Sequence, residues 1–315
     1  MTLVSAAGID VGKVHLDVGI APSGRRFRLT NDPVAITGMI ARLRQEGIQR
    51  VVLEAVGPYA RPAVTALRSA GFEVGVVNPR RIKGFREAEG RRAKTDKLDA
   101  GLIARFALQM AEVFHAVPDD RQQALKGLAT RRRQLVEIIA MEKTRLKQAA
   151  DDTIAESHRT VIRILSEERK RIESEIASHL KVDPALLRRY QLLVSIPGFG
   201  PQVATTLITD LPELGSADRR AIASLAGLAP HPTQSGTAPG RNQIAGGRPC
   251  VRAALYMAGL VASRCSPPFR ADYLAIRTQG KPAKVAIVAV ARKLLVLANA
   301  LVKNDCPYDP SYSAP

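Results

Sequence analysis

One carboxylate inside an otherwise apolar stretch near the start of the chain places the strongest constraint on the fold. Apolar and polar side chains alternate over residues 7–21, which is the period-two pattern of a half-buried β-strand. Asp10 lies in this stretch, within the run from Gly8 to Lys13, and is therefore expected at the centre of a sheet. Because an unpaired buried carboxylate is costly, Asp10 is either a structural acceptor for backbone N–H groups or part of a larger acidic site.

The charge of the chain restricts its partners. Among 315 residues, 47 Lys and Arg stand against 29 Asp and Glu, which gives a formal net charge of +18. This balance predicts a polyanionic partner rather than a small metabolite, and the length allows two or more domains. We find no apolar run near the ~18 residues of a membrane-spanning helix and no N-terminal signal pattern, so we expect a soluble, intracellular protein without a membrane partner.

The segments after the first strand predict a mixed α/β sheet. A helix is expected from Pro33 to about Glu46, and a short buried strand over residues 51–54, which ends at the acid Glu54. A second helix over residues 58–70 and a further strand over residues 73–77 follow. Strands that alternate with helices in this way are typical of a sheet with helices packed on it.

A basic segment and a helix with two acids at its start come next. Residues 78–94 contain a proline and two glycines, and we interpret them as a loop that contacts nucleic acid. The candidate contacts in this loop are Arg80, Arg81, Lys83, Arg91, Arg92 and Lys94. Thr95 can cap a helix from Asp96 to about Met110, in whose first turn Asp96 and Asp99 lie on one side. Acids at these positions can also serve only to complement the helix dipole.

The second half of the chain is predicted to be mostly helical. Residues 119–193 have the apolar spacing of a helical hairpin or a short coiled coil, which would serve self-association or act as a spacer. Residues 195–201 form a glycine-rich turn before an apolar helix. This turn resembles the helix-hairpin-helix element that grips a DNA backbone, and it fits a plain packing corner equally well.

A window without acidic residues surrounds one serine. No Asp or Glu occurs between Asp218 and Asp272, whereas several arginines do. Ser235 lies in a Pro- and Gly-rich loop of this window. A loop serine alone is rarely catalytic, but nearby arginines can neutralise a phosphate under attack by a hydroxyl. His231 is either a base for that serine or incidental. The candidate phosphate contacts are Arg241, Arg248 and Arg252.

Four acids can converge at one edge of the predicted sheet. They are Asp10, Glu54, Asp96 and Asp99. As bare anions in one small site they would force one another to take up protons, and divalent cations remove this conflict. Carboxylate oxygens suit Mg²⁺ or Mn²⁺, and two such ions can clamp the attacking and leaving oxygens of a phosphodiester. The residues thus predict a basic, metal-dependent nucleic-acid enzyme.

Motifs in both halves of the chain resemble one known family. The run from Gly8 to Lys13, the tripeptide Leu53-Glu54-Ala55 and the run from Lys94 to Ala100 look like the DEDD motif of bridge-RNA-guided insertion-sequence recombinases. These are transposases with a RuvC-like N-terminal domain. The segments from Ile196 to Gly198 and from Gln234 to Arg252 resemble the C-terminal transposase domain of that family.

The resemblance implies how the chain is divided. It implies an RNase H-like (RuvC-like) α/β domain over residues 1–115 and a helical coiled-coil segment for dimerisation over residues 116–193. A mostly α-helical transposase domain, with the helix-hairpin-helix-like element, would span residues 194–303, and residues 304–315 would form a tail.

The resemblance also implies a mechanism and partners. Ser235 corresponds to a nucleophile that attacks a scissile phosphate and leaves a phosphoserine linkage. Asp10, Glu54, Asp96 and Asp99 correspond to Mg²⁺ ligands. The implied partners are donor and target DNA, a structured bridge RNA and further copies of the chain, in a dimer or tetramer. Such a protein would work in the cytoplasm, associated with the nucleoid.

Two other functions fit parts of the same pattern. In a junction-resolving nuclease the four acids would activate water, and the products would be hydrolysed ends. In a non-catalytic scaffold the acids would be remnants, and binding would occur without cleavage. The complete set of four acids argues against the scaffold, and the arginine-rich surroundings of Ser235 favour recombination over hydrolysis.

Overall fold

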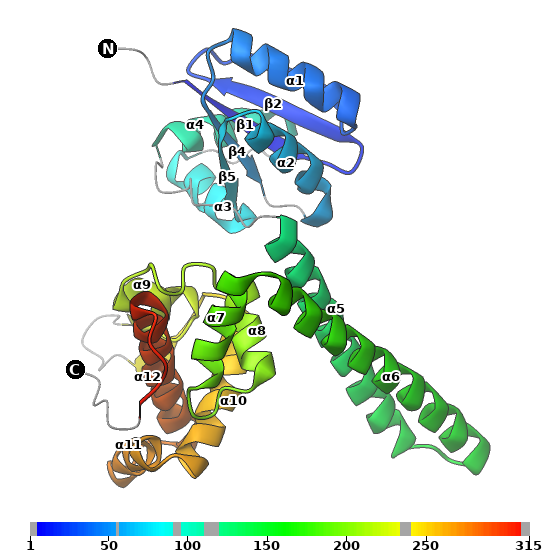
Figure 1. Ribbon diagram of the computed structural model, residues 1–315. Coiled ribbons are helices and arrows are strands. Elements are labelled where there is room, and N and C mark those ends of the chain that lie inside the picture. The colour runs from blue at the N-terminus through cyan, green and yellow to red at the C-terminus, as the bar shows by residue number, and fades with distance from the viewer. Residues whose placement is uncertain (1–4, 55–56, 91–95, 110–119, 234–240, 310–315) are drawn as a thin grey trace. The chain divides into compact units, whose positions relative to one another are not determined.

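The strand that carries Asp10 is the central strand of a five-stranded sheet in the computed structural model of the chain (Figure 1). The structure describes residues 5–54, 57–90, 96–109, 120–233 and 241–309. The chain divides into two units, Met1–Val117 and Pro118–Pro315. The first unit contains the sheet, and the second is mostly helical.

The sheet is mixed and has the strand order β3-β2-β1-β4-β5. β1 and β2 pair antiparallel, as do β2 and β3, whereas β1, β4 and β5 run parallel. The strands are β1 Ala6–Val11, β2 His15–Ala21, β3 Arg26–Thr30, β4 Arg50–Glu54 and β5 Glu73–Val77. The prediction of a mixed sheet with Asp10 at its centre is confirmed.

Helices cover both faces of this sheet (Figure 1). One face packs Ile9, Val18 and Leu53 against α1 and α2, and the other packs Val52 and Val77 against α3 and α4. Alternate residues of each strand point to opposite faces, so the two cores follow from the period-two pattern of the sequence. The helices are α1 Pro33–Gln45, α2 Arg61–Ser69, preceded by the 3₁₀ turn η1 Gly57–Ala60, α3 Pro79–Ala88 and α4 Asp96–Gln109.

Two glycines let the backbone of α4 lie directly on the sheet. Gly8 of β1 and Gly19 of β2 are paired, and both face α4. A Cβ atom at Gly8 would lie 2.1 Å from the backbone nitrogen of Ala104, and one at Gly19 would lie 2.7 Å from the carbonyl of Ala100. Real Cβ atoms do not approach so closely, so the position of α4 on the sheet requires glycine at both sites.

The basic segment after β5 is helical where the structure describes it, so the prediction of a loop over residues 78–94 is wrong for its first part. α3 covers Pro79–Ala88, and the side chain of Asn78 accepts a hydrogen bond from the backbone N–H of Arg80 at 2.9 Å. Proline is well tolerated in the first turn of a helix because its missing N–H would be unpaired there anyway. Pro79 is therefore the first residue of a helix, and it does not mark the start of a loop.

The second unit begins with two long helices, α5 Asp120–Leu146 and α6 Asp152–Val182, which pack along each other as a hairpin (Figure 1). A coiled coil is not confirmed. Arg132 donates to Glu173 across the hairpin at 2.8 Å. From the middle of α5, Arg133 donates to the buried carboxylate of Asp210 in α8 at 2.9 Å, and the Lys126 ammonium lies 3.7 Å from the same carboxylate. These ion pairs tie the hairpin to the helices that follow.

The remaining helices pack around α12. A short antiparallel hairpin of β6 and β7 projects from them. It encloses residues 234–240, which lie outside the described residues, in a segment where the sequence predicted only a loop. The elements are α7 Pro184–Val194, α8 Pro201–Asp210, α9 Arg219–Leu225, β6 Pro230–Thr233, β7 Arg241–Ile244, α10 Pro249–Cys265, α11 Pro267–Thr278 and α12 Ala283–Asn304.

The glycine turn between α7 and α8 packs against α10. Gly198 has a φ of 85°, and a Cβ atom there would lie 2.5 Å from the carbonyl oxygen of Ala258. A left-handed backbone conformation and this close approach together account for glycine at position 198. The helix-hairpin-helix expectation for this turn is not confirmed.

One helix is more apolar than the sequence analysis allowed. By length and composition alone, α12 could cross a membrane, with a mean hydropathy of 2.1 over its most apolar window. However, 56% of that window is buried inside the unit, as in the core helix of a folded protein.

Candidate active site and nucleic-acid surfaces

Two of the predicted acids lie side by side on the sheet. In the parallel pair of β1 and β4, Ile9 is opposite Leu53, so the same register places Asp10 beside Glu54. Both residues are half-buried. Asp10 is two residues from Gly8, whose missing Cβ faces α4, and side chains two apart in a strand share a face. Asp10 and Glu54 therefore belong to the face that α4 covers.

A fifth acid, which the sequence analysis did not select, lies on the other side of Asp10. Asp17 of β2 is directly opposite Asp10 and is 9% exposed. Arg28, which is opposite Asp17 on β3, donates to both carboxylate oxygens, from Nε at 2.9 Å and from Nη2 at 2.8 Å. A bidentate pair of this kind is among the stronger ion pairs and balances the charge of Asp17. The sequence feature that could have identified Asp17 is a second carboxylate in the alternating run that carries Asp10.

The other two predicted acids lie in the first turn of α4. Asp96 begins the helix and Asp99 directly precedes Ala100, whose carbonyl contacts Gly19 on the sheet. The backbone thus brings this turn to the sheet face of Asp10 and Glu54, while the side chains of Asp96 and Asp99 lie outside the described residues. Among the side chains that are described, no three His, Cys, Asp or Glu residues gather into a metal-binding group. The metal ligands therefore stay a prediction.

Three of the predicted nucleic-acid contacts in the first unit lie on the outer surface of α3. Arg80, Arg81 and Lys83 are exposed there. The guanidinium of Arg81 lies 5.7 Å from the ring centroid of Phe106, and the Lys83 ammonium lies 3.9 Å from Glu87. The remaining three candidates of this segment, Arg91, Arg92 and Lys94, lie outside the described residues.

The predicted contacts of the second unit have different environments. Arg248 donates two hydrogen bonds to Glu213, both at 2.6 Å, and these bonds raise the pKa of its guanidinium. Arg248 thus joins the start of α10 to the loop after α8. Arg252 donates to the carbonyl oxygen of Gly246 at 2.7 Å and lines an open groove. Ser235 and the side chains of His231 and Arg241 lie outside what the structure describes.

Two family models match the chain. A model of DEDD transposases, described as "Transposase", matches residues 7–155, and a model described as "Transposase IS116/IS110/IS902 family" matches residues 190–274. The pilin gene-inverting protein of Moraxella bovis is 29% identical over 271 residues, which cover 82% of this chain and 81% of the relative. The 42 kDa protein of insertion element IS900 from Mycobacterium paratuberculosis is 26% identical over 301 residues, with coverages of 89% and 67%.

A solved structure is also similar to the first unit. RuvC of Thermus thermophilus in complex with a Holliday junction substrate is 18% identical, with 35% of this chain and 95% of that chain covered and a TM-score of 0.28.

The chain is a DNA transposase or recombinase, an enzyme that cuts and rejoins DNA. Within that class it belongs to the IS110 family of transposases, and the DEDD transposase model matches its N-terminal part.

The comparisons correct the chemistry that the sequence resemblance implied. That chemistry was attack by Ser235 with a phosphoserine intermediate. The matching models describe a DEDD transposase and a transposase region, and neither provides evidence for a serine nucleophile. A phosphoserine intermediate conflicts with the mechanism of a DEDD transposase, so the supported function is a transposase or recombinase of this DEDD type. The expectation for Ser235 is withdrawn.

Proposed function

We propose that this transposase cuts DNA strands at a centre formed by Asp10, Glu54, Asp96 and Asp99, which would hold divalent cations, Mg²⁺ or Mn²⁺. The observation that carries the proposal is the register of β1 and β4, which sets Asp10 beside Glu54 on the face covered by α4. The first turn of α4 brings the other two acids to the same face. Carboxylates on three different elements form an oxygen-only donor set, which fits these hard cations.

The side chains of this centre would each have a definite task. The acids on β1 and β4 are held in place by the ladder of the sheet, so their spacing is fixed before DNA binds. The acids in the first turn of α4 would supply the remaining two carboxylates. Bound cations would stabilise the negative charge that develops on a phosphodiester under attack by a hydroxyl of water or of a DNA end. The ion pair of Asp17 with Arg28 balances the charge of a fifth carboxylate next to Asp10.

The surfaces support DNA as the partner. Exposed Arg80, Arg81 and Lys83 on α3 present cations in the same unit as the acids, where they can contact the phosphate backbone. Arg252 would add a contact in the second unit. A relative named as a pilin gene-inverting protein supports inversion of a DNA segment as one outcome of strand exchange.

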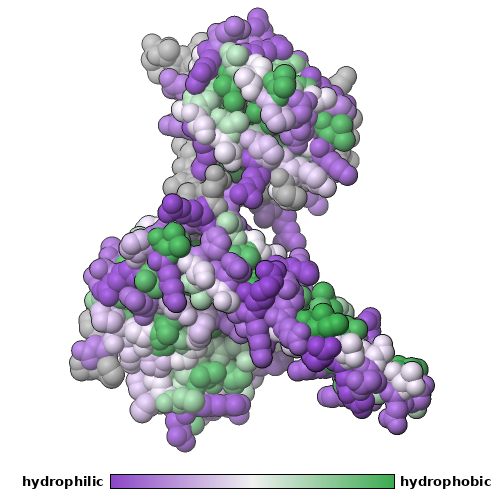
Figure 2. Space-filling model, turned by 45° about the vertical axis from the view of Figure 1, so that its right-hand side comes forward, coloured by the Kyte–Doolittle hydropathy of each residue, from purple (hydrophilic) through white to green (hydrophobic). Residues whose placement is uncertain are grey.

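We further propose two partners on the strength of the sequence resemblance. The first is a structured bridge RNA, which would specify donor and target DNA; the net charge of +18 is compatible with binding both nucleic acids. The second is another copy of the chain. The α5–α6 hairpin exposes an apolar patch among hydrophilic residues, visible in Figure 2, and this patch supports self-association into a dimer or tetramer. The exposed apolar residues are Val136, Met141, Ile154, Val161 and Ile164.

The decisive test of the acidic centre is strand cleavage by an Asp10→Asn variant. The chain is incubated with DNA of its insertion-sequence ends, the RNA encoded beside it and Mg²⁺, and products are resolved on a denaturing gel. We expect the substitution to reduce cleavage by more than about 100-fold, because it removes a charged cation ligand at the centre of the site. Glu73→Gln is the matched control, since Glu73 is exposed, lies on β5 of the same sheet and pairs with Arg50.

Two results would contradict the proposal. One is an Asp10→Asn variant that folds and cleaves at the wild-type rate. The other is a covalent protein–DNA band that survives denaturation, because cleavage by an acidic centre alone leaves no bond between protein and DNA.

A further inference from the structure

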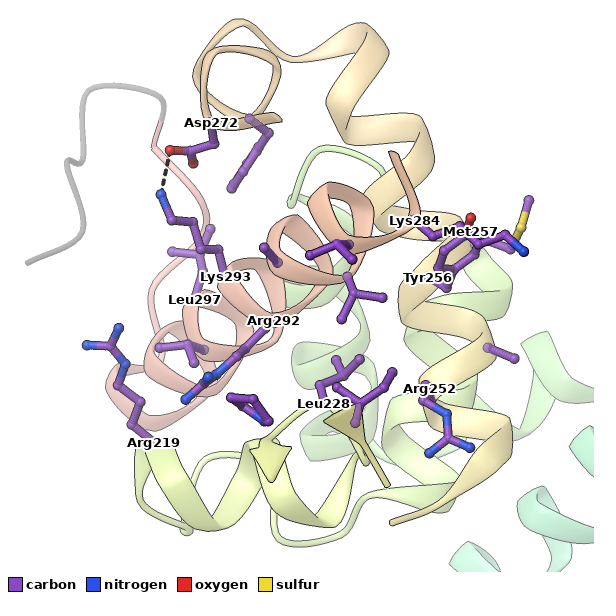
Figure 3. Close-up of a pocket in the computed structure, with 18 of the residues that line it drawn as sticks. Arg219, Leu228, Arg252, Tyr256, Met257, Asp272, Lys284, Arg292, Lys293 and Leu297 are labelled. Atoms are coloured by element: carbon purple, nitrogen blue, oxygen red, sulfur yellow. Dashed lines mark hydrogen bonds and ion pairs between the residues drawn. The ribbon is translucent and has the colours of Figure 1, made fainter. Parts of the chain in front are cut away.

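An open groove of about 1880 Å³ runs along one side of α12 in the second unit (Figure 3). Its walls come from α10, α11 and the β6–β7 hairpin. The volume exceeds that of a typical small-molecule site, which is about 300–1,000 Å³. None of the four acids proposed for DNA cleavage lines it, and of the proposed phosphate contacts Arg252 lies at its edge, so the apolar part of the groove requires its own explanation.

The floor of the groove is an uncovered apolar face of α12. Val285, Val288, Ala289, Val296 and Ala300 recur at helical spacing along it, and Val285 is 48% exposed. The stripe is about 23 Å long at 1.5 Å per residue. A helix that is apolar all round is normally buried on all sides, yet only 56% of the apolar window of α12 is buried. This face therefore has the properties of a surface that another segment covers.

The rim of the groove is basic. Arg219 and Lys293 lie on one side of the apolar floor and Arg252 and Lys284 on the other (Figure 3), and Arg292 lies between them on α12. Among the lining residues, which the structure describes, the single carboxylate is Asp272, and Lys293 donates a hydrogen bond to it. The net charge around the floor is thus positive, and the groove complements an acidic ligand.

We infer that this groove binds an amphipathic helix of a protein partner, with an apolar stripe against α12 and acidic residues along both edges. A straight apolar floor of several helical turns matches the helix-in-groove mode of recognition, in which anchors recur at i, i+3/i+4 and i+7. Single-stranded nucleic acid binds instead on exposed aromatic rings. Here the floor is aliphatic, the ring of Phe269 is buried, and the other two aromatic side chains of the lining, Tyr256 and Tyr308, are half-buried. If a single strand of nucleic acid bound here, its polar backbone would lie against the apolar floor, which is unfavourable.

The test uses two fluorescent 18-residue helical peptides with the same leucine stripe, one flanked by glutamates and one by lysines. Anisotropy is measured with the full chain. We expect the acidic peptide to bind and the basic peptide to bind at least about tenfold more weakly, because the rim repels it. Val285→Asp and Arg292→Glu should each weaken the acidic peptide by about tenfold. The matched controls are Val34→Asp, which is 83% exposed on α1, and Arg264→Glu, which is exposed on α10 outside the groove.

Three outcomes would overturn the inference. Failure of the acidic peptide to bind the wild-type chain is the first, and equal binding by wild type and Val285→Asp is the second. The third is that a single-stranded oligonucleotide, rather than the peptide, loses affinity in both groove variants and keeps it in both controls. Circular dichroism spectra of all variants establish that they are folded. Because the groove contains none of the four acids, these results do not depend on the proposed cleavage centre.

Discussion

Arg28, Asp17, Asp10 and Glu54 form one row across the sheet, with a cation at its outer end and three carboxylates after it. Like charges directly opposite each other on neighbouring strands are destabilising. The bidentate bond from Arg28 balances the charge of Asp17, the middle carboxylate of this row. Arg28 and Asp17 are therefore positioning residues: they do not bind the cations but set the net charge next to Asp10.

This arrangement predicts compensation between two substitutions. Asp17→Asn removes one negative charge directly opposite Asp10, and we expect about five- to tenfold weaker Mn²⁺ binding, which corresponds to about 1 kcal/mol of lost attraction. The double variant Arg28→Gln, Asp17→Asn restores neutrality and should bind Mn²⁺ within about twofold of wild type. Electron paramagnetic resonance titration of the protein without DNA measures this directly.

Glu73→Gln provides the control for that series, because it removes one negative charge from the same sheet at the opposite end of the parallel strands. If Mn²⁺ affinity is equally low in Asp17→Asn and in the double variant, the ion pair of Arg28 and Asp17 has a purely structural role.

The sequence identified individual site residues where neighbouring residues in the chain reveal their environment. A carboxylate in an apolar strand identified Asp10, and a strand end identified Glu54. Asp17 was missed because its position opposite Asp10 depends on where the chain turns between β1 and β2, which one residue of slippage would change. Arg248 was predicted to contact phosphate, but its partner Glu213 lies 35 residues earlier in the chain. No local pattern indicates such a bond.

At the scale of helices and strands, a close backbone contact rather than side-chain packing sets the position of α4. We expect Gly8→Ala to push α4 off the sheet, since the new methyl carbon would lie 2.1 Å from Ala104 N. Overpacking of this kind costs about 1–3 kcal/mol. Hydrogen–deuterium exchange measures the effect as faster exchange of the α4 amides.

Gly38→Ala is the comparison for that substitution. Gly38 is exposed inside α1, and a Cβ atom added there would meet no other atom within 4 Å, so alanine should stabilise the helix by about 0.5–1 kcal/mol. Unchanged exchange of the α4 amides in Gly8→Ala would show that the helix is not seated on the glycines.

Long, periodic helices and apolar strands were predicted well, because their pattern repeats over many residues. α4 spans Asp96–Gln109, where a helix to about Met110 was expected, and β4 and β5 lie within one residue of the strands expected over residues 51–54 and 73–77. The alternating run over residues 7–21 forms two strands, β1 and β2, rather than one. Short helices and strands were not predicted. α3 was hidden by Pro79 and its many basic residues, and the β6–β7 strands are four residues each, with two prolines in β6. Their pairing across residues 234–240 stabilises them, and that contact is invisible in a linear pattern.

At the scale of the whole molecule, the net charge of +18 predicts how the chain binds nucleic acid without its proposed RNA. Binding to DNA should be tight at low salt and fall steeply with log salt, because each phosphate contact releases counterions. It should also show little sequence preference, since phosphate contacts position a protein without reading bases. Electrophoretic mobility shifts with cognate and scrambled duplexes at several salt concentrations provide the measurement. Strong sequence-specific cleavage by the RNA-free protein would refute guidance by RNA.

The ion pairs of Arg133 and Lys126 with Asp210 make a lever arm of the α5–α6 hairpin. Arg133 lies at the middle of α5, and the remaining 13 residues to Leu146 extend about 20 Å beyond it. A rotation of the anchoring helices by about 10° would then sweep the tip of the hairpin through about 3 Å. Whatever binds at that tip would experience small rearrangements at α8 as a magnified displacement, and a load on the tip would act back on the buried carboxylate at the pivot.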